Sequence, residues 1–194
     1  MAETTSTPSA RKAELLERAY RYALEHGLAD LSLRPLASAI GSSPRVLLFL
    51  FGSKDGLIRE ILARARADEL ALLERVAVEA GGRPAGLAVV AERLWGWLAA
   101  DEHRALLKLW VEGYARSLVD PDGSWAGFAE ATVRDWLSLL ADSQPPSERT
   151  SRVGLARRTY VLAVLRGALL DLLATGDRDR TTAAVRTHLE SLRA

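Results

Sequence analysis

Residues 31–57 read LSLRPLASAIGSSPRVLLFLFGSKDGL, and this stretch decides the fold of the N-terminal part of the chain. Two short helices are predicted within it, over 33–40 and 44–50. Ser43 at the N-cap position and Pro44 at the first helical position are a strong start signal for the second helix. Because the turn between the two helices contains a glycine, the stretch is typical of a helix-turn-helix motif.

The apolar residues of this motif recur on the side of the helices that would face a common core. The small side chain of Ala37 permits the close approach of the two helices that the motif requires. The residues expected to form the core are Leu33, Leu36, Ile40, Leu47 and Phe51. The outer face of 44–50 would then lie in the major groove of DNA, with Ser43, Pro44 and Arg45 at its groove-facing end.

Helical periodicity also dominates the remainder of the chain. In segment 10–26, apolar or small residues recur three or four positions apart and form one face of a helix, which Gly27 ends. Ser53 can cap a fourth helix over 54–80. Further helices are expected over 84–100, 102–119, 124–142, 147–175 and 178–193. Because no alternating apolar pattern competes with these segments, we predict an all-α fold with about nine helices.

The predicted elements divide the chain into a short lead-in and two domains. Residues 1–9, rich in Ser, Thr and Pro, are expected to be disordered. Residues 10–53 form the predicted helix-turn-helix DNA-binding domain. Residues 54–194 form the predicted ligand-binding and dimerisation domain, to which helix 54–80 connects the first. No apolar segment resembles a signal peptide or a membrane span, so we expect a cytoplasmic protein that does not interact with membranes.

The composition excludes several kinds of site. The 194 residues contain no cysteine, and the three histidines are His26, His103 and His188, far apart in the sequence. Thiolate metal sites, disulfides and cysteine nucleophiles are therefore absent, and we expect no metal and no cofactor. A net charge of +1 argues against a nucleic-acid coat or a polybasic membrane binder, but it leaves room for a small DNA contact surface.

The stretch 31–57 resembles the tetracycline-repressor (TetR) family of bacterial regulators. The residues that carry this resemblance are Ser32, Leu36-Ala37, Gly41-Ser42-Ser43, Phe51 and Ser53-Lys54-Asp55-Gly56-Leu57. The rest of the chain agrees with the family only in helix count and hydrophobic pattern. The resemblance implies a homodimer whose two recognition helices read a palindromic operator in double-stranded DNA, at half-sites roughly 34–36 Å apart.

The resemblance also assigns roles at the DNA. Lys54 and the amides at helix N-termini would hold phosphates, and Arg34 is a further candidate for a phosphate contact. Arg45 is the best candidate for a base contact, because arginine pairs bidentately with guanine. The predicted DNA-binding residues are Arg34, Ser42, Ser43, Pro44, Arg45, Phe49, Leu50 and Lys54.

The chain departs from the family near the end of the recognition helix. Where family members usually carry Tyr and His, this sequence has Leu48, Phe49 and Leu50. We expect Leu50 to be exposed, where it can touch a sugar or a thymine methyl group but cannot hydrogen-bond a phosphate. Residues 1–56 carry seven basic and six acidic groups, so the affinity for DNA should be modest and strongly salt-dependent.

Aromatic residues concentrate in the second half of the chain. All five tryptophans lie within 95–136. Core packing is the simpler explanation for any one of them, whereas an aromatic ligand cavity is the interpretation that the resemblance favours. The predicted cavity walls are Trp97, Trp110, Tyr114 and Phe128, and the effector would be apolar or aromatic. Glu112, His103 and Arg116 are possible polar anchors, although each is more simply explained as a solvated side chain.

Helix 147–175 is the second informative element of this half. Between Thr159 and Ala174 it carries only two charges, and its small residues recur at alternating spacings of four and three. The predicted dimer-interface residues are Ala156, Tyr160, Ala163, Gly167 and Leu170. By resemblance, this helix and helix 124–142 build the four-helix bundle of a homodimer. The alternative is a core helix that is buried within a monomer.

Three functions remain in competition. The first is a ligand-responsive repressor, cytoplasmic and nucleoid-associated when bound to DNA, which a small effector releases by moving helix 54–80. The second is a helical small-molecule-binding protein with weakened or lost operator binding. The third, an enzyme, has least support, because the sequence contains no cysteine, no clustered histidines, no glycine-rich phosphate loop and no Gly-x-Ser-x-Gly elbow. We therefore expect no enzyme.

Overall fold

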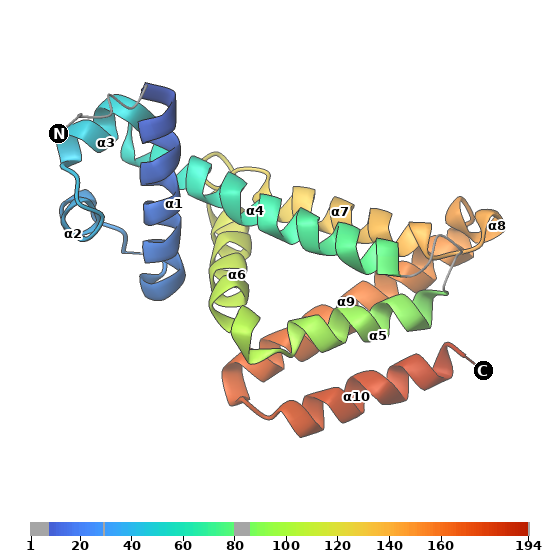
Figure 1. Ribbon diagram of the computed structural model, residues 1–194. Helices are drawn as coiled ribbons and strands as arrows, with labels where there is room; N and C mark the ends of the chain where they lie inside the picture. Colours follow the sequence, from blue (N-terminus) through green and yellow to red (C-terminus); the bar gives the residue numbers. More distant parts are fainter. Residues whose placement is uncertain (1–7, 29, 80–85, 194) are drawn as a thin grey trace. The chain divides into compact units, whose positions relative to one another are not determined.

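The computed structural model describes residues 8–28, 30–79 and 86–193, and it confirms the predicted all-α class for these residues (Figure 1). They contain no β-strand. The α-helices are α1 Pro8–His26, α2 Leu33–Ala39, α3 Pro44–Phe51, α4 Lys54–Glu79, α5 Leu87–Leu98, α6 Arg104–Val119, α7 Phe128–Asp142, α8 Pro146–Arg149, α9 Arg152–Thr175 and α10 Arg178–Ser191. A 3₁₀ turn, Asp101–His103, precedes α6.

Two predicted helices differ from those observed. The segment 147–175 forms two helices, α8 and α9, because Ser151 starts a new helix by accepting a hydrogen bond from the Gly154 N–H at 2.9 Å. The segment 124–142 becomes helical only at Phe128, after Gly127, whose φ of +73° interrupts a right-handed helix. Apart from Pro8 and Ser9, which open α1, the predicted lead-in 1–9 lies outside the described residues.

The chain divides into two compact units. The first unit comprises Met1–Ala67 and Lys108–Ala129, and the second comprises Asp68–Leu107 and Glu130–Ala194. The helix-turn-helix therefore shares a unit with the first part of α4 and most of α6. The functional boundary after residue 53 stays a prediction.

The core of the first unit forms where α1, α2 and α3 meet the start of α4. The predicted core residues Leu36, Ile40, Leu47 and Phe51 are buried, whereas Leu33 is half-buried. Two ion pairs hold α1 to α4 at the edge of this core: Lys12 Nζ lies 2.6 Å from Glu60 Oε1, and Arg64 Nε lies 2.5 Å from Glu17 Oε1.

The second unit packs α5, α9 and α10 together. The buried face of α9 contributes Val161, Leu165 and Leu169 to its core. Trp95 of α5 is buried, and its indole Nε1–H donates a hydrogen bond to the Thr182 hydroxyl of α10 at 3.0 Å. The helix α5 therefore has buried residues on more than one side. No helix in the described ranges is long and apolar enough to cross a membrane.

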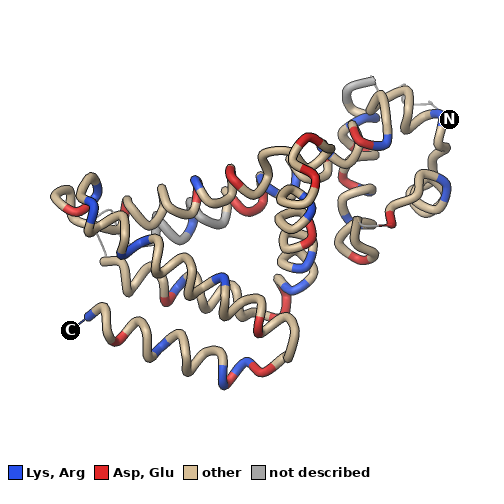
Figure 2. Tube along the Cα trace, turned by 180° about the vertical axis from the view of Figure 1, so that it is seen from behind, with Lys and Arg blue, Asp and Glu red and all other residues tan. Residues whose placement is uncertain are grey.

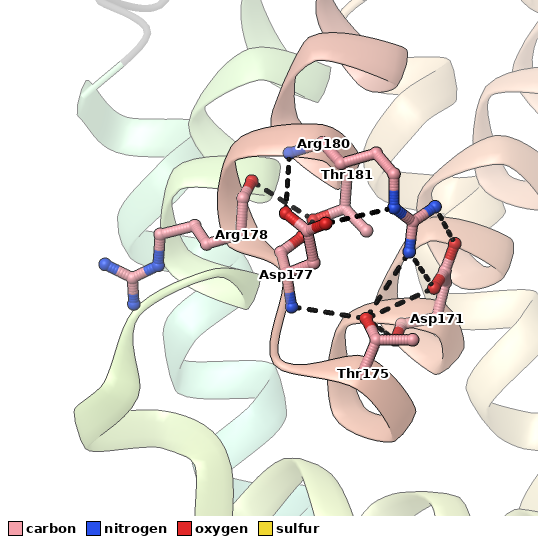
Figure 3. A network of polar contacts seen from close by, with 6 residues as sticks. All are labelled: Asp171, Thr175, Asp177, Arg178, Arg180 and Thr181. Carbon is pink, nitrogen blue, oxygen red and sulfur yellow. Dashed lines mark hydrogen bonds and ion pairs between the residues drawn. The ribbon is translucent and has the colours of Figure 1, made fainter.

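A polar network joins α9 to α10 (Figure 3). The Arg180 guanidinium donates to both carboxylate oxygens of Asp171, at 2.6 and 2.8 Å. Asp177 caps α10 by accepting a hydrogen bond from the Arg180 N–H at 3.0 Å, and the Thr181 hydroxyl donates to the Asp177 carbonyl at 2.7 Å. The hydrogen bonds from Arg180 lower the pKa of the Asp171 carboxyl below its ordinary value of 3.8.

This network should make the stability of the second unit depend on acid pH. Because the pKa of Asp171 is lower in the folded state, its contribution is present above the ordinary pKa and is lost as pH falls through the lowered one. The variant Asp171→Asn should therefore have a lower melting temperature at neutral pH and a weaker dependence on pH between about 5 and about 2. Melting curves recorded across this range measure both effects.

The control is Glu190→Gln, which removes an exposed carboxylate of α10 that pairs with no cation among the described residues. It should leave the acid dependence close to that of the unmodified chain. If the Asp171 variant and the unmodified chain show the same acid dependence, the network does not stabilise the junction between α9 and α10.

Candidate DNA interface and effector region

Local signals in the sequence set the positions of α2 and α3. Gly41 adopts a φ of +67° in the turn, and the Ser42 N–H donates to the Ala37 carbonyl at 2.8 Å. The hydroxyl of Ser43 accepts a hydrogen bond from the Val46 N–H at 3.3 Å, and Pro44 opens α3, so the predicted start signal is confirmed. At the start of α2, by contrast, the N-cap Ser32 makes no side-chain capping hydrogen bond.

The two faces of α3 differ sharply in exposure. Leu47 and Phe51 are buried, whereas Arg45 and Val46 are exposed and Phe49 is 82% exposed. The expectation that Leu50 is exposed was wrong, because it is half-buried. Leu50 lies one helical turn after Leu47 and therefore borders the buried face. The exposed apolar residue at the centre of the outer face is instead Phe49.

Three cationic side chains lie on α3 and on the helices that precede and follow it in the chain. Arg34 lies in the first turn of α2, Arg45 in the first turn of α3, and Lys54 is the first residue of α4; all three are exposed. None of them forms an ion pair or a side-chain hydrogen bond with another of the described residues. Elsewhere, charges of both signs alternate along the helices without gathering in one block (Figure 2). These three side chains are thus available to phosphates or base edges.

The aromatic residues of the predicted effector site fall into both units. On α6, Trp110 and Tyr114 lie with ring centroids 5.2 Å apart. Phe128, at the start of α7, packs closely against the same helix, since a Cβ placed on Gly113 would lie 3.1 Å from its ring. Trp97 belongs to the second unit, where it stacks on His103 with centroids 4.0 Å apart. In the first unit, Trp110 and Tyr114 therefore lie on α6, and Phe128 packs against the same helix.

The proposed polar anchors have different surroundings. Glu112 Oε2 accepts a hydrogen bond from the Leu28 N–H at 3.0 Å, so this side chain links α6 to the segment that follows α1. No local pattern in the sequence predicts this contact, because the two residues are 84 positions apart. The Nδ1 atom of His103 lies 3.0 Å from the Trp97 carbonyl oxygen, and Arg116 is exposed.

A cavity of about 370 Å³ lies within the second unit, and none of these aromatic side chains lines it. Its lining comes from the start of α5, the connection between α7 and α8, and the end of α10. Gln144, one of its lining residues, is buried: its amide donates to the Gly154 carbonyl at 3.1 Å, and its carbonyl oxygen accepts from Arg158 at 3.0 Å. Sequence reasoning did not find this residue, whose role is to join α7 to α9.

The predicted interface stripe lies on the exposed face of α9. Its members are Ala156, Tyr160, Ala163, Gly167 and Leu170, all of them exposed. Tyr160 remains 59% exposed although its ring contacts His188 of α10 edge-on, with centroids 4.4 Å apart. The stripe is opposite the buried face of α9, so its apolar surface is not covered within the described part of this chain.

Comparisons with known proteins agree with this arrangement. Residues 15–61 match the family model described as bacterial regulatory proteins, tetR family. A transcriptional regulator from Rhodococcus sp. Rha1 is structurally similar, with a TM-score of 0.74 at 20% identity over 96% of this chain and 96% of that chain. A TetR-like transcriptional regulator from the same organism gives a TM-score of 0.61 at 20% identity, over 95% of this chain and 93% of that chain.

A third similar structure is that of the multidrug binding protein EbrR complexed with imidazole, with a TM-score of 0.64 at 25% identity over 92% of this chain and 89% of that chain. The complex of EbrR with proflavin gives the same TM-score at 24% identity, over 92% of this chain and 99% of that chain. No protein of curated function matches the sequence. Residues 15–61, which contain the helix-turn-helix, thus match the tetR family of bacterial regulatory proteins, and over the rest of the chain the likeness is one of fold.

Proposed function

We propose that this chain is a ligand-responsive repressor that binds a palindromic operator as a homodimer, in the cytoplasm and at the nucleoid when bound to DNA. The observation that carries the proposal is the outer face of α3, which is exposed and bears Arg45, with Arg34 and Lys54 on the flanking helices. A helix presented in this way fits the major groove, and cations without carboxylate partners can contact phosphates. We propose no enzymatic activity.

The exposed stripe of α9 supports the homodimer. An isologous contact buries the same patch on both protomers, and small residues such as Ala163 and Gly167 let two helices approach closely. The two-fold axis of such a dimer matches the symmetry of a palindromic operator. We propose that α7 completes the bundle beside α9.

The aromatic residues on and beside α6 support an apolar or aromatic effector. Trp110, Tyr114 and Phe128 provide the apolar walls, and Glu112 lies between the first two in sequence. Its Oε1 atom is buried and has no hydrogen-bond partner among the described residues, so it can accept a hydrogen bond from an effector. The likeness to EbrR, which binds proflavin, points to the same class of ligand.

The proposed response to the effector is a movement of α4, which begins directly after the helix-turn-helix. Because Glu112 also holds the Leu28 N–H, an effector that displaces α6 would release the segment between α1 and α2 at the same time. Regulation requires that the effector bind the DNA-competent form less tightly than the other form. Equal operator affinity with and without every tightly bound effector would contradict this mechanism.

The second candidate function is a small-molecule-binding protein that no longer binds an operator. The observation in its favour is the apolar end of α3, where Leu48 and Phe49 are exposed in place of hydrogen-bonding residues. The weak excess of basic residues in the first unit points the same way. Binding to DNA at low ionic strength decides between the two functions.

An electrophoretic mobility shift with the DNA upstream of the chain's own gene tests the proposal. We expect a shift at low salt that weakens steeply as salt rises. Arg45→Ala should weaken binding by about ten- to hundredfold, because it removes the bidentate base contact. The control Arg186→Ala removes an exposed arginine of α10, outside the proposed dimer interface, and should bind like the unmodified chain.

Two outcomes would contradict the proposal. The absence of any shift at low salt would exclude the repressor and favour the second function. An equal loss in the Arg45 and Arg186 variants would show that the first turn of α3 does not contact bases.

A further inference from the structure

We propose that α3 reads thymine: the side chains of Phe49 and Val46 contact thymine methyl groups in the major groove beside a guanine bound by Arg45. This inference rests on the proposed DNA binding and deepens it, since it names the bases that the outer face of α3 prefers. The sequence suggested a methyl contact for Leu50, and we assign this contact to Phe49 and Val46 instead.

The outer face of α3 brings together one charged and two apolar side chains. Arg45 and Phe49 are four residues apart and Val46 and Phe49 are three apart, so the three side chains share one face of the helix. That face is opposite Leu47 and Phe51, which are buried. Phe49, at 82% exposed, is the most exposed of the large hydrophobic residues described in the structure. A side chain at the centre of the outer face is the one that enters a groove furthest.

The helix α3 offers few side chains that can form hydrogen bonds with base edges. Among residues 44–51, PRVLLFLF, the only side chain able to hydrogen-bond is that of Arg45. Hydrogen-bonded base readout by this helix is therefore restricted to Arg45 and to Ser43 in the preceding turn, because the hydroxyl oxygen of Ser42 is buried. The C5-methyl group of thymine is the apolar feature that a base pair presents in the major groove. An apolar helix face can thus distinguish thymine from the other bases, but it cannot satisfy their polar edges.

The charges around this face favour DNA over a protein as the occupant. A protein surface apolar enough to cover Phe49 would also desolvate Arg45, whose charge would then require a buried carboxylate. DNA supplies methyl groups, guanine acceptors and phosphates within one groove. The exposed Arg34 and Lys54, on the helices before and after α3, fit the phosphates at its edges.

Selection of duplexes followed by removal of the methyl groups tests the inference. The full chain is used to select from a pool of duplexes with a random core of about 30 base pairs, long enough for two half-sites one helical turn apart. We expect enriched duplexes with thymines beside guanine in each half-site. Each enriched duplex is then made again with deoxyuridine in place of thymidine, which deletes only the methyl groups. Its affinity should fall about fourfold for each contacted methyl group lost.

Phe49→Ala and Val46→Ala connect this effect to α3. Both variants should bind the thymine and uracil duplexes with closer affinities than the unmodified chain does, and the Phe49 variant should lose most of the difference. The control is Val119→Ala, because Val119 is 79% exposed on α6 of the same unit and should have no part in base readout. It should keep the full preference for thymine. The salt dependence should not change on methyl removal, since phosphate contacts are unaltered.

The outcomes separate this inference from the proposed function. If duplexes are enriched but bind equally well with uracil, α3 does not read methyl groups, although the chain still binds DNA. If the thymine preference persists in both the Phe49 and the Val46 variants, the contact belongs to other residues. If no duplex is enriched at any salt concentration, the proposed operator binding itself is wrong.

Discussion

Replacing Gly56 with alanine should destabilise the first unit by about 2–3 kcal/mol. A Cβ at this position would lie 2.1 Å from the carbonyl oxygen of Phe51, which is the last residue of α3. A backbone atom cannot rotate away as a flexible side chain can, so α3 and α4 must separate. The hydrogen bond from the Gly56 N–H to the Ser53 hydroxyl, at 2.9 Å, would be distorted by the same movement. Because α3 is the predicted recognition helix, operator affinity should fall together with stability.

Thermal and urea unfolding of the full chain measure this effect, with Gly96→Ala as the matched control. Gly96 is an exposed residue within α5, and a Cβ there would have no atom within 4 Å. The control should gain up to about 1 kcal/mol, since alanine favours the helix. If the two variants change the free energy of unfolding by similar amounts, the junction between α3 and α4 accepts a methyl group at Gly56 without loss of stability.

The start of α9 repeats the arrangement found at the start of α4. In both helices a serine N-cap accepts a hydrogen bond from the N–H of a glycine three residues later, at 2.9 Å. A Cβ on Gly154 would lie 2.0 Å from the Glu148 carbonyl oxygen. The glycine in each case lets the end of one helix contact the first turn of the next. Sequence periodicity predicts the helices, but it does not predict this close contact between consecutive helices.

Local chemistry explains which parts of the fold could be predicted. Ser43 and Pro44 place the start of α3 through a hydroxyl and a fixed φ, both of which act within one turn. The boundary between α8 and α9 escaped prediction because Thr150 and Ser151 are compatible with a continuing helix. The break is stabilised by the Ser151 cap and also by a contact from outside the segment, the hydrogen bond from Gln144 to the Gly154 carbonyl.

The candidate sites divide in the same way. The outer face of α3 follows from helical periodicity, which places Arg45 and Phe49 together, although it did not predict how far Leu50 is buried. The contact between Glu112 and Leu28 joins residues that no local pattern relates. The aromatic residues could be counted in the sequence, but their division between the two units depends on tertiary packing within each unit. Trp97 stacks on His103, whereas Trp110 contacts Tyr114.

Glutamate in place of Ala163 should convert the proposed homodimer into a monomer. Ala163 is the central member of the exposed stripe on α9, where a second copy of the helix would approach most closely. In an isologous interface the substitution occurs twice, so two carboxylates without partners would be buried near the two-fold axis. Since one uncompensated buried charge costs about 3–5 kcal/mol, the dissociation constant of the dimer should rise at least about a thousandfold.

Sedimentation velocity at micromolar protein concentration measures this change, and Ala183→Glu is the matched control. Ala183 is an exposed alanine of α10 in the same unit, on another side of that helix from His188, so its substitution adds the same charge outside the stripe. The control should remain a dimer, and both variants should keep the helical content of the unmodified chain. Binding to a palindromic operator should collapse only in the Ala163 variant, because a monomer engages one half-site and loses the gain from linking the two. A dimeric Ala163 variant with unchanged operator affinity would place the interface on another surface of the chain.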